Sequence, residues 1–361
     1  MTDKVTLMKG NEALAMAMIR YGADGYFGYP ITPQSEVLEK LEEEMPWETT
    51  GMVVLQAESE VAAINMVYGG AMTGKAVCTS TSSPGFSLMQ EGVSYLAASE
   101  VPALLINVQR GGPGLGTIHA SQADYCQACK GGGHGDYHMI VLAPSSVQEM
   151  ADMVALGFDL AFKYRCVSMI LADGTIGQLM EKVVLPEQRP RRTDDEIREQ
   201  CPWAVNGRKG MRPSNVVTSL ELDDDKMEEN NWRFQACYRE IEKNETRCEL
   251  IDVEDCDYLI TAFGTTARVA MKTMELARAE GIKVGMFRPI TLWPFPEKQL
   301  REAAKNVKGI LCVELNAGQM VEDVKLAVEC KMPVEHYGRF GGNVPTPDEL
   351  LNVLKEKLIN K

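Results

Sequence analysis

The regular alternation of strand-like and helix-like segments over the first 180 residues constrains the fold of this chain most strongly. Short strand-like runs at residues 25–29, 53–55 and 75–80 are each followed by a longer helix-like segment, and a further strand-like run at 102–109 precedes a glycine-rich stretch. The run at 102–109 is largely apolar, which is typical of a strand buried on both faces of a parallel sheet. The alternation predicts an α/β fold with a mostly parallel, doubly wound sheet.

The alternation is interrupted once and then resumes. Residues 184–250 are polar and rich in turn signals, including Pro186 and Pro190, and strand and helix periodicity returns near residue 257. A chain of 361 residues is long enough for two domains that each bury a core. We therefore predict a first domain over residues 1–185, a connector over 186–250 and a second α/β domain over 251–361.

Composition excludes several classes of function. The formal charge of −14 disfavours nucleic acid and anionic membranes as main partners, because both need clustered Lys and Arg. No apolar run reaches the roughly 18–20 residues of a membrane-spanning helix. The first residues follow no signal-peptide pattern, and the ten cysteines are scattered, as in a cytosolic protein. We expect a cytoplasmic protein.

Two carboxylates stand at the start of a predicted helix rich in small residues. Glu58 and Glu60 follow the strand at residues 53–55, and the turn at residues 29–33 closes the preceding strand. One interpretation is favourable negative charge at a helix N-terminus, which spacing alone favours. The other is a carboxylate held against a ring nitrogen of an aromatic cofactor, where it does acid–base work.

Arg110 ends the strand at residues 102–109 and precedes a glycine-rich stretch. It either pairs with a surface carboxylate or recognises a substrate carboxylate through its planar fork of donors. Ligands in parallel α/β sheets bind at the carboxyl ends of strands. The position of Arg110 therefore favours the second interpretation.

The glycine- and cysteine-containing motifs are weaker signals. Residues 112–117 lack the third glycine of a dinucleotide fingerprint, so a nicotinamide site is not supported. The glycines of residues 130–136 allow close approach to a ligand or simply a hinge. Cys126 and Cys129 have the spacing of a redox motif but fall in a predicted loop without a second pair. We predict no metal site and no iron–sulfur cluster in this chain.

Taken together, the chain resembles the alpha subunits of the 2-oxoacid:ferredoxin oxidoreductases, most closely the branched-chain (2-oxoisovalerate) type. The resemblance covers essentially the whole chain. It implies a thiamine-diphosphate-binding domain of the pyrimidine type followed by a transketolase-C-terminal-like domain. The matching segments are residues 29–33, 56–63, 82–85, 107–116, 130–137, 171–174 and 287–296.

The resemblance also implies residue roles. Glu60 aligns with the glutamate that contacts the aminopyrimidine nitrogen and promotes the imino tautomer, with Glu58 as its nearest competitor. Thr32 and Arg110 match residues that hold the carboxylate and carbonyl oxygen of the oxoacid. The turn that contacts the cofactor contains Tyr29, Pro30 and Ile31.

Two expected patterns are missing from the sequence. It has no Gly-Asp-Gly followed by an Asn pair, which holds Mg²⁺ and the diphosphate, and no cluster-binding cysteines. The resemblance therefore implies a beta subunit with the diphosphate and Mg²⁺ site, a gamma subunit, and a ferredoxin-like delta subunit with 4Fe-4S clusters. The implied reaction is the oxidative decarboxylation of a branched-chain 2-oxoacid, with CoA as acyl acceptor and ferredoxin as electron acceptor.

Alternatives remain open from the sequence. A 2-oxoglutarate-specific member would need a distal cation, for which Lys130, His119 and His134 are candidates, and a pyruvate-specific member is a third option. A noncatalytic scaffold that only docks the cofactor-bearing chain belongs to another class. Such a scaffold would not need Glu60 at its helix start.

Overall fold

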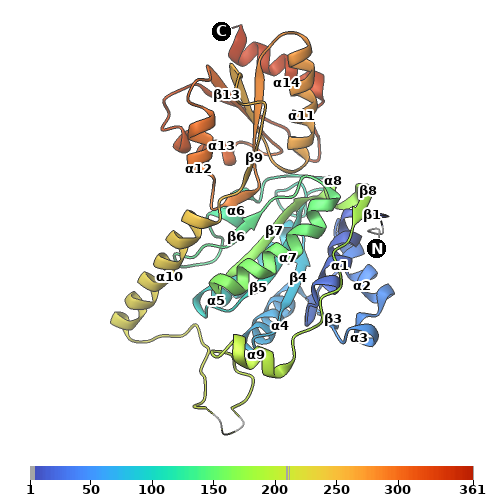
Figure 1. Ribbon diagram of the computed structural model, residues 1–361, viewed down its shortest axis with the longest axis vertical. Helices are drawn as coiled ribbons and strands as arrows, with labels where there is room; N and C mark the ends of the chain where they lie inside the picture. The colour runs from blue at the N-terminus through green and yellow to red at the C-terminus, as the bar shows by residue number, and fades with distance from the viewer. Residues whose placement is uncertain (1–4, 209, 211, 361) are drawn as a thin grey trace.

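The computed structural model describes residues 5–208, 210 and 212–360. Two α/β lobes lie at opposite ends of the long axis, and the C-terminus lies at the far end of the smaller lobe (Figure 1). The larger lobe is built mainly from the N-terminal half of the chain. Both sheets are mostly parallel, which confirms the predicted α/β class.

The larger sheet has seven strands in the order β12-β6-β7-β5-β4-β2-β3. All neighbours are parallel except β12, which runs antiparallel to β6. The central strands β4, β5 and β7 are buried along their whole length, as expected for strands covered on both faces of a parallel sheet. The strands are β2 (Gly25–Gly28), β3 (Val53–Gln56), β4 (Val77–Thr81), β5 (Ala103–Gln109), β6 (Ile140–Leu142), β7 (Val167–Asp173) and β12 (Thr291–Trp293).

Helices cover this sheet in two groups. On one side α1 packs against both α2 and α7, and on the other α4 packs against α5. Serine side chains cap the N-termini of α4 and α7. The Ser59 hydroxyl accepts a hydrogen bond from the Ala62 N–H, and the Ser146 hydroxyl accepts one from the Glu149 N–H. The helices are α1 (Gly10–Tyr21), α2 (Ser35–Glu44), α3 (Pro46–Thr49), α4 (Glu60–Met72), α5 (Ser83–Ala98) and α7 (Val147–Tyr164).

The smaller sheet has the order β14-β13-β10-β11-β9, with only the edge strand β9 antiparallel. Helix α11 packs against α14, and α12 packs against α13. The elements are β9 (Cys248–Ile251), β10 (Tyr258–Thr261), α11 (Gly264–Ala279), β11 (Val284–Pro289), α12 (Glu297–Ala303), β13 (Gly309–Glu314), α13 (Met320–Ala327), β14 (Val334–Gly338), α14 (Pro347–Leu354) and the π-helix η1 (Lys355–Ile359).

Two strand pairings cross long stretches of sequence. β1 (Val5–Lys9) pairs antiparallel with β8 (Met180–Val184) in a two-stranded sheet beside the larger lobe. β12, at residues 291–293, joins β6 at one edge of the larger sheet. The stretch of chain that leads from the larger to the smaller lobe contains α8 (Gly174–Gln178), α9 (Asp194–Gln200) and the long α10 (Asp224–Asn244). Helix α10 extends along the larger lobe (Figure 1).

The prediction that Cys126 and Cys129 lie in a loop is wrong. Both cysteines lie in a short helix, α6 (Tyr125–Cys129), which begins within the glycine-rich stretch. One helical turn is too short to produce a periodic apolar pattern, so the sequence gives no sign of it. Both are free thiols, as are the other eight cysteines.

A seam of buried polar contacts joins the two lobes. Asp173, at the end of β7, accepts hydrogen bonds from the Thr265 backbone N–H at 2.8 Å and the Thr265 hydroxyl at 2.5 Å. Arg288 on β11 reaches across to Glu149 with two hydrogen bonds of 2.7 and 3.0 Å. Arg288 and Asp173 are 4% and 1% exposed, so both are shielded from water. These contacts take the place of the hydrogen bonds that water would otherwise make to the two side chains.

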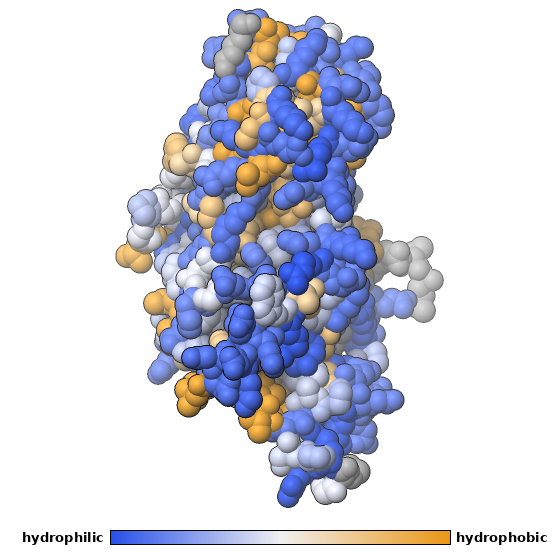
Figure 2. Space-filling model, turned by 90° about the vertical axis from the view of Figure 1, so that its left-hand side faces the viewer, coloured by the Kyte–Doolittle hydropathy of each residue, from blue (hydrophilic) through white to orange (hydrophobic). Residues whose placement is uncertain are grey.

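The surface is predominantly polar. On the face that carries α10, apolar side chains form separate patches in a hydrophilic surround (Figure 2). Among the described residues, no helix combines the length and apolarity needed to cross a bilayer.

Candidate functional site

Glu60 is the first residue of α4, and its carboxylate is directed toward the interior. The side chain is 7% exposed, whereas Glu58, two residues earlier, is exposed. The Ser59 cap fixes the first turn of the helix and with it the direction of Glu60. Within the described part of the chain, no hydrogen bond or ion pair reaches the Glu60 carboxylate.

Several other buried polar atoms near the ends of β4 and β5 also lack partners. A buried polar atom without a hydrogen bond costs about 1–3 kcal/mol. A group of such atoms at one sheet edge therefore suggests that a ligand completes them. Among the described residues, the unpartnered atoms at this edge are Thr81 Oγ1, Ser82 Oγ, Asn107 Oδ1 and Arg110 Nε.

This set of atoms fits the ring of a polar heteroaromatic cofactor. A carboxylate, two hydroxyl groups and an amide oxygen offer both donors and acceptors within one buried region. The fit agrees with an aminopyrimidine ring, whose nitrogens need an acid partner and hydrogen-bond acceptors. The chain's own residues therefore suit the pyrimidine half of thiamine diphosphate.

Arg110 directly follows β5 and is 9% exposed. Its Nη1 donates to the Thr32 carbonyl oxygen at 2.8 Å, and its Nη2 donates to the Leu115 carbonyl oxygen at 3.0 Å. Its backbone N–H donates to the Ser83 hydroxyl at 3.1 Å. No carboxylate within the described residues pairs with Arg110, so the guanidinium keeps its charge and its Nε donor for a ligand.

The turn at residues 29–33 lies beside the start of α4, because β2 and β3 are parallel neighbours. The Ala57 N–H donates to the Gly28 carbonyl oxygen at 2.8 Å, which joins the two strand ends. Tyr29 and Ile31 are partly buried, and Pro30 and Thr32 are exposed. The structure thus brings the turn and Glu60 to adjacent strand ends and joins Thr32 to Arg110.

Asp124 is a buried carboxylate that sequence reasoning missed. It accepts hydrogen bonds from the Ser83 hydroxyl at 2.6 Å and from Asn107 Nδ2 at 2.9 Å. Burial raises the pKa of Asp124, although these two hydrogen bonds lower it in part. Because Ser83 also contacts the backbone of Arg110, Asp124 helps to fix the end of β5. No motif or spacing in the sequence marks this residue.

A cavity of about 390 Å³ opens beside Arg110 between the two lobes. The larger lobe contributes Ser83, Arg110 and Asp124 to its wall. The smaller lobe contributes another part of the wall through residues that the sequence did not indicate, among them Leu315, Asn316, Ala317, Gln319 and Phe340. The smaller lobe therefore shapes the space next to the arginine.

The three candidate distal cations lie elsewhere. The Lys130 ammonium is paired with the Asp323 carboxylate. His134 is exposed and lines a different cavity, beside α5 and α10. His119 packs close to Gly342. None of the three lines the cavity beside Arg110.

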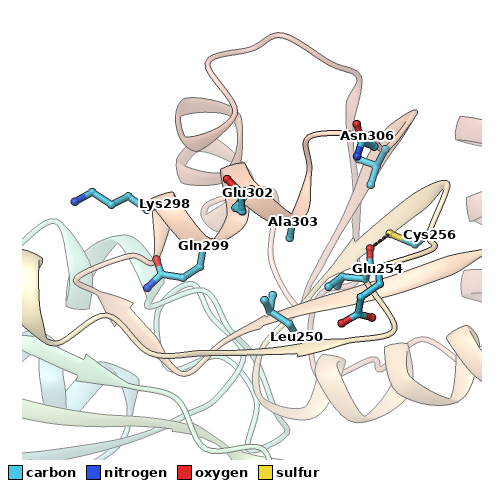
Figure 3. Close-up of a pocket in the computed structure, with 10 residues that line it drawn as sticks. Leu250, Glu254, Cys256, Lys298, Gln299, Glu302, Ala303 and Asn306 are labelled. Carbon is cyan, nitrogen blue, oxygen red and sulfur yellow. Dashed lines mark hydrogen bonds between the residues drawn. The ribbon is translucent and has the colours of Figure 1, made fainter.

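A separate cavity of about 590 Å³ lies in the smaller lobe, between β9 and α12 (Figure 3). Its wall includes Leu250, Cys256, Gln299 and Ala303, with Lys298 and Glu302 also on α12. It contains none of the residues that the sequence indicated as functional. Size alone therefore does not identify the functional site of this chain.

Comparison with known proteins places this geometry in a family. Residues 16–244 match the family model of the pyruvate flavodoxin/ferredoxin oxidoreductase thiamine-diphosphate-binding domain. Residues 256–350 match the model of the pyruvate:ferredoxin oxidoreductase core domain II. The first match includes Glu60, Thr32 and Arg110.

Full-length relatives agree with these matches. The ketoisovalerate oxidoreductase subunit VorB of Methanothermobacter marburgensis is 47% identical, over 97% of both chains. The 2-oxoglutarate synthase subunit KorA of the same species is 35% identical, over 96% of this chain and 97% of the relative.

A solved structure shows the same fold. The 2-oxoglutarate:ferredoxin oxidoreductase of Magnetococcus marinus, determined with 2-oxoglutarate, coenzyme A and succinyl-CoA bound, superposes with a TM-score of 0.83 at 28% identity. The alignment covers 98% of this chain and 65% of that one, so this chain spans slightly less than two thirds of its length. The chain belongs to the pyruvate flavodoxin/ferredoxin oxidoreductase family, as an alpha-type subunit of the thiamine-diphosphate-dependent 2-oxoacid:ferredoxin oxidoreductases.

Proposed function

We propose that this chain is the alpha subunit of a CoA-acylating 2-oxoacid:ferredoxin oxidoreductase that acts on a branched-chain 2-oxoacid such as 2-oxoisovalerate. The observation that carries the proposal is the buried Glu60 carboxylate, which has no partner within the part of the chain that the structure describes and lies beside unpartnered polar atoms at the sheet edge. The reaction converts the 2-oxoacid, CoA and two oxidised ferredoxins into acyl-CoA, CO₂, a proton and two reduced ferredoxins.

Glu60 acts as the proton switch in this proposal. Thiamine diphosphate, when bound, would supply the carbon nucleophile for decarboxylation of the oxoacid. Glu60 shares a proton with a pyrimidine nitrogen, and its burial keeps water from competing for that proton. Tyr29, Pro30 and Ile31 form the wall of the site beside the cofactor.

Arg110 and Thr32 hold the oxoacid. Among residues 5–208, 210 and 212–360, the Arg110 Nε has no hydrogen-bond partner and no carboxylate pairs with the guanidinium, which suits Arg110 to the substrate carboxylate. The hydrogen bond from Arg110 to the Thr32 carbonyl oxygen keeps the two residues on the same side of the site. The Ser83 hydroxyl accepts the backbone N–H of Arg110 and donates to Asp124, and these contacts fix the backbone of Arg110.

The remaining chemistry belongs to partner chains in this proposal. No group of three or more potential metal ligands is present in residues 5–208, 210 and 212–360. We assign the diphosphate and Mg²⁺ site to a beta subunit and the 4Fe-4S clusters to a ferredoxin-like delta subunit, with a gamma subunit completing the complex. The complex would operate in the cytoplasm, where it reduces ferredoxin.

The domain division also stays a proposal. We assign residues 1–185 to the cofactor-binding domain, 186–250 to the connector and 251–361 to the transketolase-C-terminal-like domain. The family models match residues 16–244 and 256–350, which leaves the end of the first domain open.

The cavity beside Arg110 supports an uncharged substrate side chain. Apart from Arg110, no cationic residue lines it among the described residues, and Asp124 contributes a carboxyl group. A distal carboxylate of 2-oxoglutarate would therefore lack a counter-charge. The identity to VorB, whose name refers to ketoisovalerate, exceeds that to KorA, which supports the same choice.

The test is a comparison of kcat/KM for 2-oxoisovalerate, pyruvate and 2-oxoglutarate on the purified complex, measured by CoA-dependent ferredoxin reduction. We expect the highest value with 2-oxoisovalerate. A higher value with 2-oxoglutarate or pyruvate would assign the chain to that specificity instead. Activity that survives replacement of Glu60 would favour the scaffold alternative.

A further inference from the structure

Gly85 lies in the first turn of α5 and faces the start of α4. A methyl carbon attached to the Gly85 Cα would lie 2.6 Å from Glu60 Oε1, 2.9 Å from Glu60 Cγ and 2.2 Å from Thr81 Oγ1. Side-chain Cβ atoms essentially never lie within 3.0 Å of another non-bonded heavy atom, so these contacts would force a neighbouring atom to shift. The space that a side chain would fill at Gly85 is already occupied by the Glu60 carboxyl group and the Thr81 hydroxyl.

The Glu60 carboxylate is the group that an added methyl would displace. Thr81 ends the buried strand β4 and is 2% exposed, so its backbone is fixed by the sheet. The Glu60 carboxylate has no hydrogen bond within the described residues, and only packing determines its position. A side chain held by packing alone moves when the packing changes.

We propose that Gly85 is a positioning residue for the proton switch: its missing side chain leaves the space in which the Glu60 carboxylate meets the pyrimidine ring. This inference rests on the proposed role of Glu60. A misplacement of about 1 Å at a reacting group reduces the rate by roughly 100-fold. Gly85 itself does not touch the reacting atoms.

The test isolates the contact with Glu60 from the contact with Thr81. Thr81→Ala removes the hydroxyl that would obstruct the new methyl first, so it serves as the reference chain. Thr81→Ala/Gly85→Ala then adds a methyl whose nearest remaining contacts are to Glu60 Oε1 and Cγ. Gly157→Ala is a matched control for a buried glycine, because its methyl would lie 2.7 Å from Leu104 Cδ1, away from these residues.

The readout is exchange of the thiazolium C2 proton of bound thiamine diphosphate in the assembled complex, without substrate and at saturating cofactor. We expect roughly 100-fold slower exchange in Thr81→Ala/Gly85→Ala than in Thr81→Ala. Gly157→Ala should lower the Tm and leave the exchange rate at the wild-type value. Equal exchange rates in the double variant and in Thr81→Ala would overturn the proposal.

A second measurement decides the matter if the double variant assembles poorly. Glu60→Ala removes both atoms of Glu60 that the methyl would meet. Gly85→Ala should therefore lower the Tm of the Thr81→Ala complex but not that of the Thr81→Ala/Glu60→Ala complex. Equal losses of Tm in the two backgrounds would show that Gly85 acts through another contact.

The outcome separates this inference from the proposed function. Normal C2 exchange in Glu60→Gln would refute the proton-switch role itself. Slow exchange in Glu60→Gln together with normal exchange in Thr81→Ala/Gly85→Ala would refute only the positioning role of Gly85.

Discussion

The candidate-site edge of the larger sheet, where Glu60 and Arg110 lie, and the seam between the lobes both bury charged side chains, but the hydrogen bonding of these side chains differs. At the seam, Asp173 accepts four hydrogen bonds and Arg288 pairs with two glutamates. At the candidate-site edge, the Glu60 carboxylate and Arg110 Nε have no partner among the described residues. Satisfied buried charges hold a structure together, whereas unsatisfied ones indicate where a ligand belongs.

This difference predicts that variants in the two regions will have different effects on turnover and stability. Replacing Glu60 should reduce turnover while leaving the folded complex stable, because its carboxylate makes no hydrogen bond or ion pair within the described residues. Changes at the seam should lower stability and leave the turnover of the folded fraction largely intact. A variant that behaves the opposite way would break the comparison.

The largest effect is expected for Glu60→Gln. An amide of the same size fills the site but cannot share a proton with the pyrimidine nitrogen, so kcat should fall by roughly 10²–10⁴-fold. Ferredoxin reduction by the purified complex measures this directly. The control is Glu58→Gln, which changes an exposed carboxylate two residues away and should retain wild-type kcat. Similar losses in both variants would contradict the assignment.

The next largest effect is expected for Arg288→Ala at the seam. Removing one partner of a buried ion pair leaves Glu149 without its two-point contact and destabilises by about 3–5 kcal/mol. Denaturant unfolding of the complex should show the loss. Arg268→Ala breaks a more exposed pair with Glu181 at the same seam and should cost far less. Comparable losses would mean that burial does not decide the strength of these contacts.

Arg110→Ala should act on substrate binding. Losing a charge-assisted contact of about 1.5–3 kcal/mol should lower kcat/KM roughly 10–100-fold, mostly through KM for the oxoacid. Arg110→Lys keeps the charge without the planar fork and should recover only part of the loss. A change in KM for CoA with no change for the oxoacid would assign Arg110 to the other substrate.

The smallest effect, about 1–3 kcal/mol, is expected for Asp173→Asn, which replaces one acceptor oxygen by a donor facing the Thr265 N–H. Burial raises the pKa of Asp173, although hydrogen bonds lower it in part, so the folded state binds the proton more tightly than the unfolded state. That contribution to stability is complete below the unfolded pKa, near 3.9, and is lost as the pH rises through the folded pKa.

The stability deficit of Asp173→Asn should therefore be largest near pH 4 and narrow as the pH rises. Chemical denaturation of wild type and variant at a series of pH values measures this difference. A deficit that widens with pH would show that the folded state prefers the ionised form of Asp173.

The sequence predicted the features that depend on local pattern. Buried parallel strands such as β5 and the small-residue helix α4 have clear signatures over their own length. The pairing of β1 with β8 and of β12 with β6 escaped prediction, because the paired residues are about 150–180 positions apart and each strand is short. No local pattern encodes such a register.

The candidate site shows the same limit. Glu60 and Arg110 were predicted because they flank recognisable strands, and Thr32 was predicted from the family resemblance. Asp124, and the wall from the smaller lobe with Leu315 and Phe340, depend on contacts between distant parts of the chain. Their roles follow only from three-dimensional packing.

The most direct test of the central claim is the exchange rate of the thiazolium C2 proton in the Glu60→Gln complex with bound thiamine diphosphate and no oxoacid. This measurement isolates the proton step from substrate binding, electron transfer and acyl transfer to CoA. The account predicts exchange slower than wild type by at least about 100-fold, with the cofactor still bound and the Tm unchanged. Exchange at the wild-type rate in a fully loaded Glu60→Gln complex would contradict it.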